Sequence, residues 1–180
     1  MNRFVIAEPQ NCIGCRTCEV ACAMAHKPAD IPMLTPENFR PRLKVIKGAR
    51  VSTAVLCRHC DDAPCANACP AGAIVVRDNS VQVLQERCVG CKTCMVACPY
   101  GAIEVVTVPA DMPSGSVLKT RNLKAQAIKC DLCIDRAGGP ACVEACPTKG
   151  LHLVDAAVLE ATLKARREQA ALVDIPNLPL

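Results

Sequence analysis

Residues 88–99 read CVGCKTCMVACP, a run of four cysteines that ends in Cys-Pro. Three other stretches are variants of it: CIGCRTCEVAC at 12–22, CRHCDDAPCANACP at 57–70 and CDLCIDRAGGPACVEACP at 130–147. The first of these lacks the proline and has Ala23 in its place. Together the four groups account for all 16 cysteines of the 180-residue chain. Because the groups share one spacing pattern, they form an internal repeat around which we expect the fold to be organised.

The chain has few of the large side chains that usually fill a protein core. Its aromatic residues are Phe4, Phe39 and Tyr100, and it has no tryptophan. The fraction of cysteine is close to the level at which a scaffold depends on cysteine chemistry as well as on apolar burial. We therefore expect the Ala, Val, Ile and Leu side chains to surround groups that the cysteines hold.

Disulfide bonds are the first alternative use of so many cysteines. The N-terminal segment MNRFVIAEPQ has no apolar signal region, no twin arginine and no cleavage site, so nothing in it directs the chain to an oxidising compartment. No stretch approaches the roughly 18 uncharged apolar residues of a membrane span. We expect a cytoplasmic protein without a membrane span, and clustered cysteines in the cytoplasm usually bind metal.

The spacing within each group favours iron-sulfur clusters over zinc. Zinc ribbons place two distant C-x-x-C pairs around one ion. A C-x-x-C-x-x-C loop instead brings three thiolates to one point, and Gly14 and Gly90 permit close approach or a positive φ there. Such a loop is poorly placed to add a fourth ligand, and in two-cluster bacterial ferredoxins the cysteine before the proline binds the other cluster. Four [4Fe-4S] clusters are therefore the expected cofactors.

The formal net charge of +4 counts every cysteine as a neutral thiol. An oxidised cluster with its four thiolates carries about −2, so four clusters contribute roughly −8 and reverse the sign. We therefore interpret the excess of Lys and Arg as compensation for buried anions and expect no nucleic-acid partner.

Short strands are predicted beside the cysteine groups. Apolar runs at 73–76 and 81–84 flank the turn sequence DNS at 78–80, which predicts a hairpin between the second and third groups. Strand-like runs also follow the third group at 102–106 and the fourth group at 151–154.

Two connecting segments and a tail complete the chain. The segment 27–50 contains four prolines, so we expect it to wrap the surface without a long helix. The segment 107–124 is predicted to be a polar loop. The Ala-rich tail from Asp155 to about Val173 is predicted to be an amphipathic helix with Asp155 as its N-cap.

Several stretches carry a resemblance to known proteins. They are MNRFVIA, CIGCRTCEVAC, LTPENFRPRLKVIKG, DDAPCANACP, QERCVGCKTCMVACPYGA and GPACVEACPTKGL, spread over residues 1–151. The third is not a cluster motif, which narrows the assignment. The chain resembles the four-cluster iron-sulfur proteins that accompany molybdopterin oxidoreductases and hydrogenases. Within them it is similar first to the HydN-type electron-transport proteins linked to formate dehydrogenase H and formate hydrogenlyase. The small polyferredoxin subunit of formate hydrogenlyase is the next protein that it resembles.

The resemblance implies an α+β fold of two nested ferredoxin-like units, built around four [4Fe-4S] clusters and followed by a C-terminal helix. The outer unit would comprise residues 1–52 and 125–180, which carry the first and fourth cysteine groups. The inner unit would comprise residues 53–106, which carry the second and third groups. Residues 107–124 would form the loop that connects them.

The resemblance also implies a ligand set for each cluster, in which the last cysteine of every group crosses to the neighbouring cluster. In the outer pair, one cluster would use Cys12, Cys15, Cys18 and Cys146, and the other Cys130, Cys133, Cys142 and Cys22. In the inner pair, one cluster would use Cys57, Cys60, Cys65 and Cys98, and the other Cys88, Cys91, Cys94 and Cys69.

The function implied is electron carriage without catalysis. The donor would be a molybdopterin-containing formate dehydrogenase or related oxidoreductase, and the acceptor a hydrogenase or another protein, in an anaerobic cytoplasm. Two alternatives stay open, namely an iron-sulfur subunit permanently docked in a molybdopterin reductase and a maturation or assembly factor for formate dehydrogenase or hydrogenase. The sequence has no G-x-G-x-x-G after a strand, no P-loop lysine motif and no G-x-S-x-G, so it gives no sign of an enzyme active site.

Other polar residues in or near the cysteine groups have simpler interpretations. His26, His59 and His152 could be ligands or proton carriers, but four cysteines are available for each cluster. We therefore expect the histidines to be structural or surface residues. Arg16 and Lys92 occupy equivalent positions in two groups and are expected to be solvated counter-charges.

The crossing of ligands makes a prediction about Cys22. The substitution Cys22→Ser is expected to perturb the cluster of the fourth group, because Cys22 would complete that cluster and not the one held by its own loop. Iron analysis and EPR of the variant check this. Damage to the cluster of the first group would contradict the crossed scheme.

Overall fold

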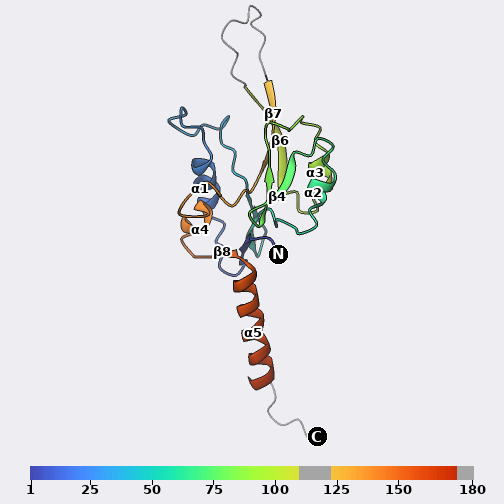
Figure 1. Ribbon diagram of the computed structural model, residues 1–180. Coiled ribbons are helices and arrows are strands. Elements are labelled where there is room, and N and C mark those ends of the chain that lie inside the picture. Colours follow the sequence, from blue (N-terminus) through green and yellow to red (C-terminus); the bar gives the residue numbers. More distant parts are fainter. Residues whose placement is uncertain (110–122, 174–180) are drawn as a thin grey trace, which may run out of the picture.

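The computed structural model describes residues 1–109 and 123–173 and shows short helices and four two-stranded antiparallel sheets (Figure 1). The strands are β1 (Phe4–Ala7), β2 (Lys44–Lys47), β3 (Ser52–Val55), β4 (Ile74–Arg77), β5 (Ser80–Val83), β6 (Ile103–Pro109), β7 (Leu123–Lys129) and β8 (Leu151–Val154). The helices are α1 (Thr17–Ala25), α2 (Pro64–Asn67), α3 (Thr93–Ala97), α4 (Ala141–Glu144) and α5 (Ala156–Val173). The α+β class and the C-terminal helix expected from the sequence are confirmed.

The sheet of β1 and β8 joins the two ends of the folded body. Phe4 pairs with Val154 and Ala7 with Leu151, so the strand that precedes the first cysteine group lies beside the strand that follows the fourth. The strand at 151–154 was predicted, whereas β1 was not. This ladder brings the first and fourth groups into the same part of the fold.

The predicted hairpin between the second and third groups is confirmed as β4 and β5. Asp78 and Asn79 both have a φ of 52°, which is the left-handed geometry of a type I′ turn that matches the twist of the two strands. Asp and Asn tolerate this conformation better than most residues, so the turn follows from the local sequence. Ser80, expected in the turn, is the first residue of β5.

A second hairpin, β2 and β3, lies partly within the proline-rich segment 27–50. This segment contains no helix, as expected, but its last residues pair with Ser52–Val55, a feature that the sequence analysis missed. The two strands are only four residues long each, and Lys44 and Lys47 give β2 charged ends. Such a short run carries too little alternation to be recognised from sequence.

The connecting loop predicted for 107–124 is wrong at both ends. Strand β6 continues to Pro109 and β7 begins at Leu123, and these two residues pair at the end of the ladder. The middle of the predicted loop, 110–122, lies outside the described residues. The expected start of the outer unit at residue 125 also falls inside β7.

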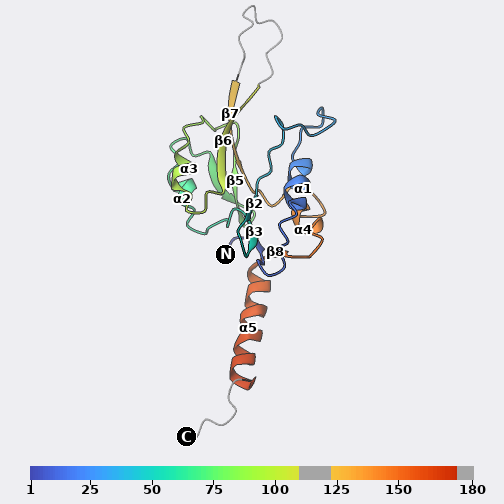
Figure 2. The same cartoon turned by 180° about the vertical axis from the view of Figure 1, so that it is seen from behind.

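Two separate cores fill the body. The first core contains Val5, Cys18, Cys22, Leu43, Val45, Ala54, Leu56, Cys130, Leu132, Cys142 and Leu151. The second core contains Ala63, Cys65, Ile74, Val81, Cys94, Ile103 and Ala127. Figures 1 and 2 show the helices in two pairs, α1 beside α4 and α2 beside α3, with strands between the pairs. Cysteine is thus a core residue on both sides, as the shortage of aromatic side chains implied.

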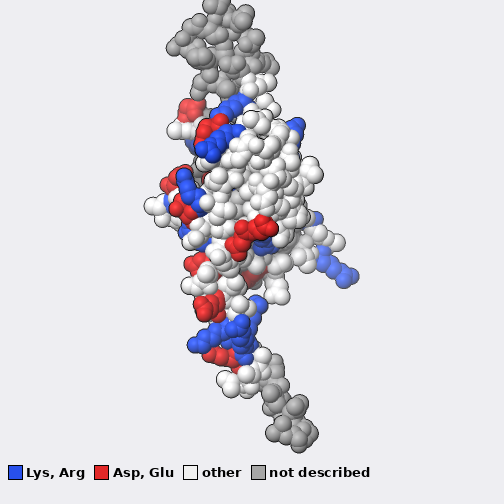
Figure 3. Space-filling view, turned by 45° about the vertical axis from the view of Figure 1, so that its right-hand side comes forward, with Lys and Arg blue, Asp and Glu red and all other residues white. Residues whose placement is uncertain are grey.

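Helix α5 extends away from this body (Figures 1 and 2). The backbone N–H of Val158 donates a hydrogen bond to Asp155 Oδ1 at 2.9 Å, which confirms Asp155 as the N-cap. Figure 3 shows acidic and basic side chains along this helix, while much of the body that faces the viewer is white. Within residues 1–109 and 123–173, no helix combines the length and the apolar character needed to cross a membrane.

Gly90 allows the third cysteine loop to pack against β7. We therefore predict that a larger residue at this position lowers stability. Gly90 has a φ of +73°, and an added Cβ would lie 2.3 Å from the Cβ of Ala125. The substitution Gly90→Ala is expected to lower the free energy of unfolding by about 2–4 kcal/mol, from left-handed strain and overpacking together.

Gly72→Ala is the matched control, because Gly72 has a φ of +56° but nothing within 4 Å of an added Cβ. It carries the strain alone, so a loss of about 1 kcal/mol is expected. Thermal unfolding under anaerobic conditions compares the two variants. Equal losses would show that the contact with β7 does not matter.

Candidate metal centres

The loops that carry the first two cysteines of the first and third groups have the same backbone conformation. Arg16 and Lys92, which directly precede α1 and α3, both adopt the left-handed conformation, with φ of 65° and 66°. Gly14 and Gly90 have φ of 69° and 73°, which confirms the positive φ anticipated at these positions. The two loops therefore present their cysteines in the same way.

A threonine hydroxyl lies next to the most exposed thiol of each of these loops. Thr17 Oγ1 donates to Cys15 Sγ at 3.3 Å, and Thr93 Oγ1 donates to Cys91 Sγ at 3.5 Å. These side-chain hydrogen bonds hold the pKa of Cys15 and of Cys91 below the ordinary value of a thiol. The thiolate, which is the metal-binding form of cysteine, is thereby favoured.

The last cysteine of each group accepts a hydrogen bond from a backbone amide. In the three groups that end in Cys-Pro the amide belongs to the residue four positions on, and the pairs are Ala73 to Cys69 at 3.3 Å, Ala102 to Cys98 at 3.4 Å, and Gly150 to Cys146 at 3.3 Å. The residue before each amide is left-handed, with φ between 52° and 58°, namely Gly72, Gly101 and Lys149. One local turn therefore orients the last cysteine in all three groups.

Cys22, in the group that lacks the proline, reaches the same result differently. Helix α1 continues past Cys22 to Ala25, so the tight turn does not form. The backbone N–H of Arg42 donates to Cys22 Sγ instead, at 3.3 Å. The segment 27–50, which was expected only to wrap the surface, thus supplies this amide.

Two cavities are each lined by four cysteines drawn from two groups. One is lined by Cys88, Cys91 and Cys94 of the third group and Cys69 of the second. The other is lined by Cys12, Cys15 and Cys18 of the first group and Cys146 of the fourth. These are the sets that the resemblance implied for two clusters. Three thiolates from one loop and one from a distant turn fit a cubane better than a zinc ribbon.

Within each of the other two sets, the cysteines also lie near one another. Burial raises the pKa of Cys142 strongly, and the nearby thiolates of Cys130 and Cys22 raise it further. Burial likewise raises the pKa of Cys60, followed by the effects of Cys57 and Cys98. Crowded thiols of this kind ionise when a cation joins them, which fits a metal cluster. That each set of four binds iron stays a prediction.

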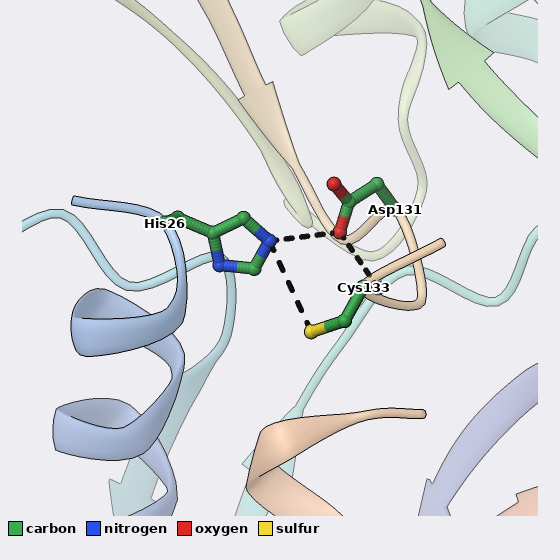
Figure 4. A group of neighbouring side chains, drawn as sticks. All are labelled: His26, Asp131 and Cys133. Carbon is green, nitrogen blue, oxygen red and sulfur yellow. Dashed lines mark hydrogen bonds and ion pairs between the residues drawn. The ribbon is translucent and has the colours of Figure 1, made fainter. Parts of the chain in front are cut away.

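A partly buried ion-pair network adjoins the fourth group (Figure 4). His26 Nδ1 lies 2.7 Å from the carbonyl oxygen of Cys22, and His26 Nε2 lies 3.0 Å from Asp131 Oδ1. Asp131 also pairs with the guanidinium of Arg42 and accepts the backbone N–H of Cys133 at 3.0 Å. Both ring nitrogens face acceptors, so the geometry requires that both carry a hydrogen.

The pKa values agree with a charged network. Burial alone would lower the pKa of His26, but its hydrogen bonds, first to Asp131 and then to Cys133 and Cys22, raise that pKa to about 12. Burial would raise the pKa of Asp131, yet His26 and Arg42 hold it well below its ordinary value. Burial would raise the pKa of the Cys133 thiol, but the hydrogen bond from His26, whose Nε2 lies 3.9 Å from Cys133 Sγ, lowers it together with the backbone N–H of Ala141 and the charge of His26. The network therefore consists of the charged side chains of His26, Asp131 and Arg42. His26 contacts Cys22 and Cys133, which belong to one set.

His26, Asp131 and Cys133 lie close enough to share a metal ion, with their candidate ligand atoms within 4.8 Å of one another. The guanidinium of Arg42 on Asp131 makes an ion pair the better interpretation. His26 was expected to be only a structural or surface residue, and the sequence analysis missed its contact with the cysteines. Since His26 and Asp131 are 105 residues apart, no local pattern signals the pair.

The remaining two histidines lie elsewhere. His59 is 1% exposed, and its Nδ1 accepts the backbone N–H of Val81 at 3.0 Å. His152 Nε2 lies 3.3 Å from a carboxylate oxygen of Glu8, where β8 pairs with β1. His59 is held by the backbone of Val81, in keeping with a structural role, and the half-exposed His152 lies at the surface beside Glu8.

Comparison with known proteins identifies the type of centre. The family described as 4Fe-4S dicluster domain matches residues 50–156, and the one described as 4Fe-4S binding domain matches residues 9–25. The chain is 56% identical over 174 residues to the electron transport protein HydN of Escherichia coli strain K12, which covers 96% of this chain and 99% of HydN. It is 53% identical to the putative electron transport protein YsaA of the same strain, covering 86% of this chain and 91% of that protein.

A third relative is a subunit of a named complex. Formate hydrogenlyase subunit 2 of Escherichia coli strain K12 is 41% identical over an alignment that covers 100% of this chain and 95% of that subunit. HydN and formate hydrogenlyase subunit 2 are matched over 96% and 100% of this chain, so the similarity to them spans all four cysteine groups and is not confined to a single motif.

Asp131 is predicted to stabilise the fold through its two cations. The substitution Asp131→Asn leaves Arg42 and His26 half-buried without a carboxylate, and we expect a loss of about 2–3 kcal/mol in the free energy of unfolding. Asp135→Asn, on the exposed part of the same loop, is the control and should change stability by less than about 0.5 kcal/mol. Anaerobic thermal unfolding measures both variants. A D131N variant as stable as D135N would contradict the assigned role of the network.

Proposed function

Since the chain belongs to the 4Fe-4S dicluster proteins and is a relative of the HydN electron-transport proteins, we propose that it carries electrons through four [4Fe-4S] clusters between two partner proteins. The observation that carries this proposal is the pair of cavities in which three cysteines of one group meet the last cysteine of another. Bound clusters would supply one-electron redox centres at these places.

The proposed ligand sets are the four crossed ones. They are Cys12, Cys15, Cys18 with Cys146; Cys130, Cys133, Cys142 with Cys22; Cys57, Cys60, Cys65 with Cys98; and Cys88, Cys91, Cys94 with Cys69. The packing of α1 beside α4 and of α2 beside α3 supports two nested ferredoxin-like units, the outer one with the first and fourth groups. The register of β1 with β8 supports the same arrangement.

The exposure of the cysteines supports two places at which electrons enter or leave the protein. Cys15 and Cys91 are the exposed cysteines, and they belong to two different sets. All four cysteines of the set formed by Cys22, Cys130, Cys133 and Cys142 are buried. Partner proteins would therefore exchange electrons near Cys15 and near Cys91, while the other two sets lie within the protein.

The role of the protein is to hold the thiolates and to keep water away from the interior ones. The backbone amides of Ala73, Ala102, Gly150 and Arg42 donate hydrogen bonds to the sulfur atoms of the four crossing cysteines. Hydrogen bonds from the protein to cluster sulfurs also tune reduction potential. Water is excluded by the two apolar cores, in which Leu56 and Val81 are almost fully buried.

The similarity to known proteins supports the choice of electron donor and acceptor. The similarity to formate hydrogenlyase subunit 2 supports a molybdopterin-containing formate dehydrogenase or related oxidoreductase as donor and a hydrogenase as acceptor. We place the protein in the cytoplasm, where thiols stay reduced. A permanently docked subunit and a maturation factor are the competing assignments.

The cofactor assignment predicts the metal content. Anaerobically purified protein is expected to hold about 16 irons and about 16 sulfides per chain and to be reducible by one electron per cluster. Metal analysis and an EPR-monitored dithionite titration provide the measurement. A colourless protein with about four zinc ions would contradict every iron-sulfur assignment.

The same preparation separates the functional alternatives. A carrier is expected to capture its partners from formate-grown cells at low salt and to release them at high salt, whereas a docked subunit keeps a large partner throughout. Gene deletion tests the maturation factor. Partner enzymes made without their metal centres would contradict carriage, and fully assembled enzymes that no longer exchange electrons would support it.

A further inference from the structure

Lys129, the last residue of β7, is a buried cation at the junction of the two cores. It is 3% exposed, and its Nζ donates hydrogen bonds to the carbonyl oxygen of Val81 and, at 2.7 Å, to that of Cys130. Val81 belongs to the second core and Cys130 to the first. Figures 1 and 2 show β7 between the two helix pairs. One ammonium group therefore joins both halves of the protein.

This ammonium has no acidic partner in the part of the chain that the structure describes. Within residues 1–109 and 123–173, no carboxylate oxygen lies within 4.0 Å of Lys129 Nζ. Asp131, two residues away, is engaged by His26 and Arg42. Carbonyl oxygens solvate a cation only in part, and an unpaired buried charge is strongly unfavourable. The burial of Lys129 therefore requires negative charge that the carboxylates do not supply.

The histidine next to Lys129 is neutral. His59 Nδ1 accepts the backbone N–H of Val81, the same residue whose carbonyl accepts from Lys129. A ring nitrogen that accepts carries no hydrogen, so the imidazole has no charge. His59 thus fills the junction without adding a second cation.

The anions that can match Lys129 are thiolates of two different sets. Val81, whose carbonyl accepts from Lys129, shares the second core with Cys65. Cys130, whose carbonyl also accepts from Lys129, lies in the first core, against which Cys57 packs. Cys65 and Cys130 belong to the two sets that include no exposed cysteine. Lys129 therefore acts on both interior sets from one position.

We propose that Lys129 is a buried countercharge shared by the two interior clusters and that it favours their reduced states. This inference rests on the proposed function, since it assumes that Cys57, Cys60, Cys65 and Cys98 bind one cluster and that Cys22, Cys130, Cys133 and Cys142 bind the other. Lys129 is then a positioning residue for electrons, which acts through charge and not as a ligand.

The electron balance gives the sign of the effect. One-electron reduction by an external donor takes a cluster with its four thiolates from about −2 to about −3, with no proton gained. A fixed cation stabilises the more negative state more, and in a dry interior this attraction is weakly screened. Lys129 therefore raises the reduction potential of the interior clusters. An electron that crosses the protein is stabilised while it resides on either of them.

The test compares two lysines of the same strand in anaerobically purified holoprotein. Lys129→Met removes the buried charge and keeps the length of the side chain, whereas Lys124→Met removes an exposed charge from β7. EPR-monitored redox titration is expected to show, in K129M, an at least tenfold smaller equilibrium constant for reduction of two of the four clusters, equivalent to about 59 mV. K124M should leave all four unchanged.

Two further variants keep the inference falsifiable. Lys129→Arg retains the charge and should retain the wild-type potentials, so a shift in K129R equal to that in K129M would overturn the charge mechanism. If K129M loses iron, Lys129→Gln carries the measurement, because its amide can still donate to a carbonyl. Loss of iron in both neutral variants but not in K129R would assign the charge to assembly and overturn the effect on potential.

Failure of the inference can be told apart from failure of the proposed function. Wild-type protein without about 16 irons contradicts the proposed function itself. Wild-type and K129M proteins that both hold full iron and share the same four potentials contradict only the role of Lys129.

Discussion

The ionisation of crowded cysteines is the constraint on which the rest of this structure depends. Metal clusters bind thiolates, yet burial raises the pKa of Cys18 to about 11 and that of Cys130 to about 12. A protein that gathers 16 cysteines must therefore bring donors and cations to their sulfur atoms. The local turns do so with backbone amides and threonine hydroxyls, and the tertiary fold adds His26, Arg42 and Lys129. Apolar packing is secondary, because the largest side chains are almost absent from the sequence.

The same constraint accounts for the small size of the regular elements. The helices of the cysteine groups are between four and nine residues long, and most strands have four residues. Such elements are too short to be stable alone in water. They are fixed by the cores they share, and these cores contain cysteines from groups far apart in the chain. Cluster binding and folding are thus expected to be coupled in this protein.

Charge is distributed to match this interior. The formal net charge of +4 counts histidine as neutral. Lys129 lies inside the body, while Arg42 and the charged His26 are partly buried and share one carboxylate, Asp131. Among the described residues, Lys129 is hydrogen-bonded to carbonyl oxygens and has no carboxylate partner. The excess of basic residues is therefore partly a property of the interior, which agrees with its interpretation as compensation for buried anions.

The sequence alone determined the features that a few consecutive residues control. The hairpin at 74–83, the positive φ of Gly14 and Gly90, the N-cap at Asp155 and the presence of cysteine loops all depend on local backbone geometry and spacing. The tertiary structure decided what lies between distant segments: the pairing of β1 with β8, the amide of Arg42 on Cys22, and the places of His26 and Lys129. These could not be predicted because a contact between residues 20 or more positions apart leaves no periodicity in the sequence. The β2–β3 hairpin is local, but its strands of four residues each are too short to show a pattern. The cysteine spacing indicated that each loop is poorly placed to add a fourth ligand, and the resemblance implied that the last cysteine crosses to another group, but only the fold brought Cys69 to the third loop and Cys146 to the first.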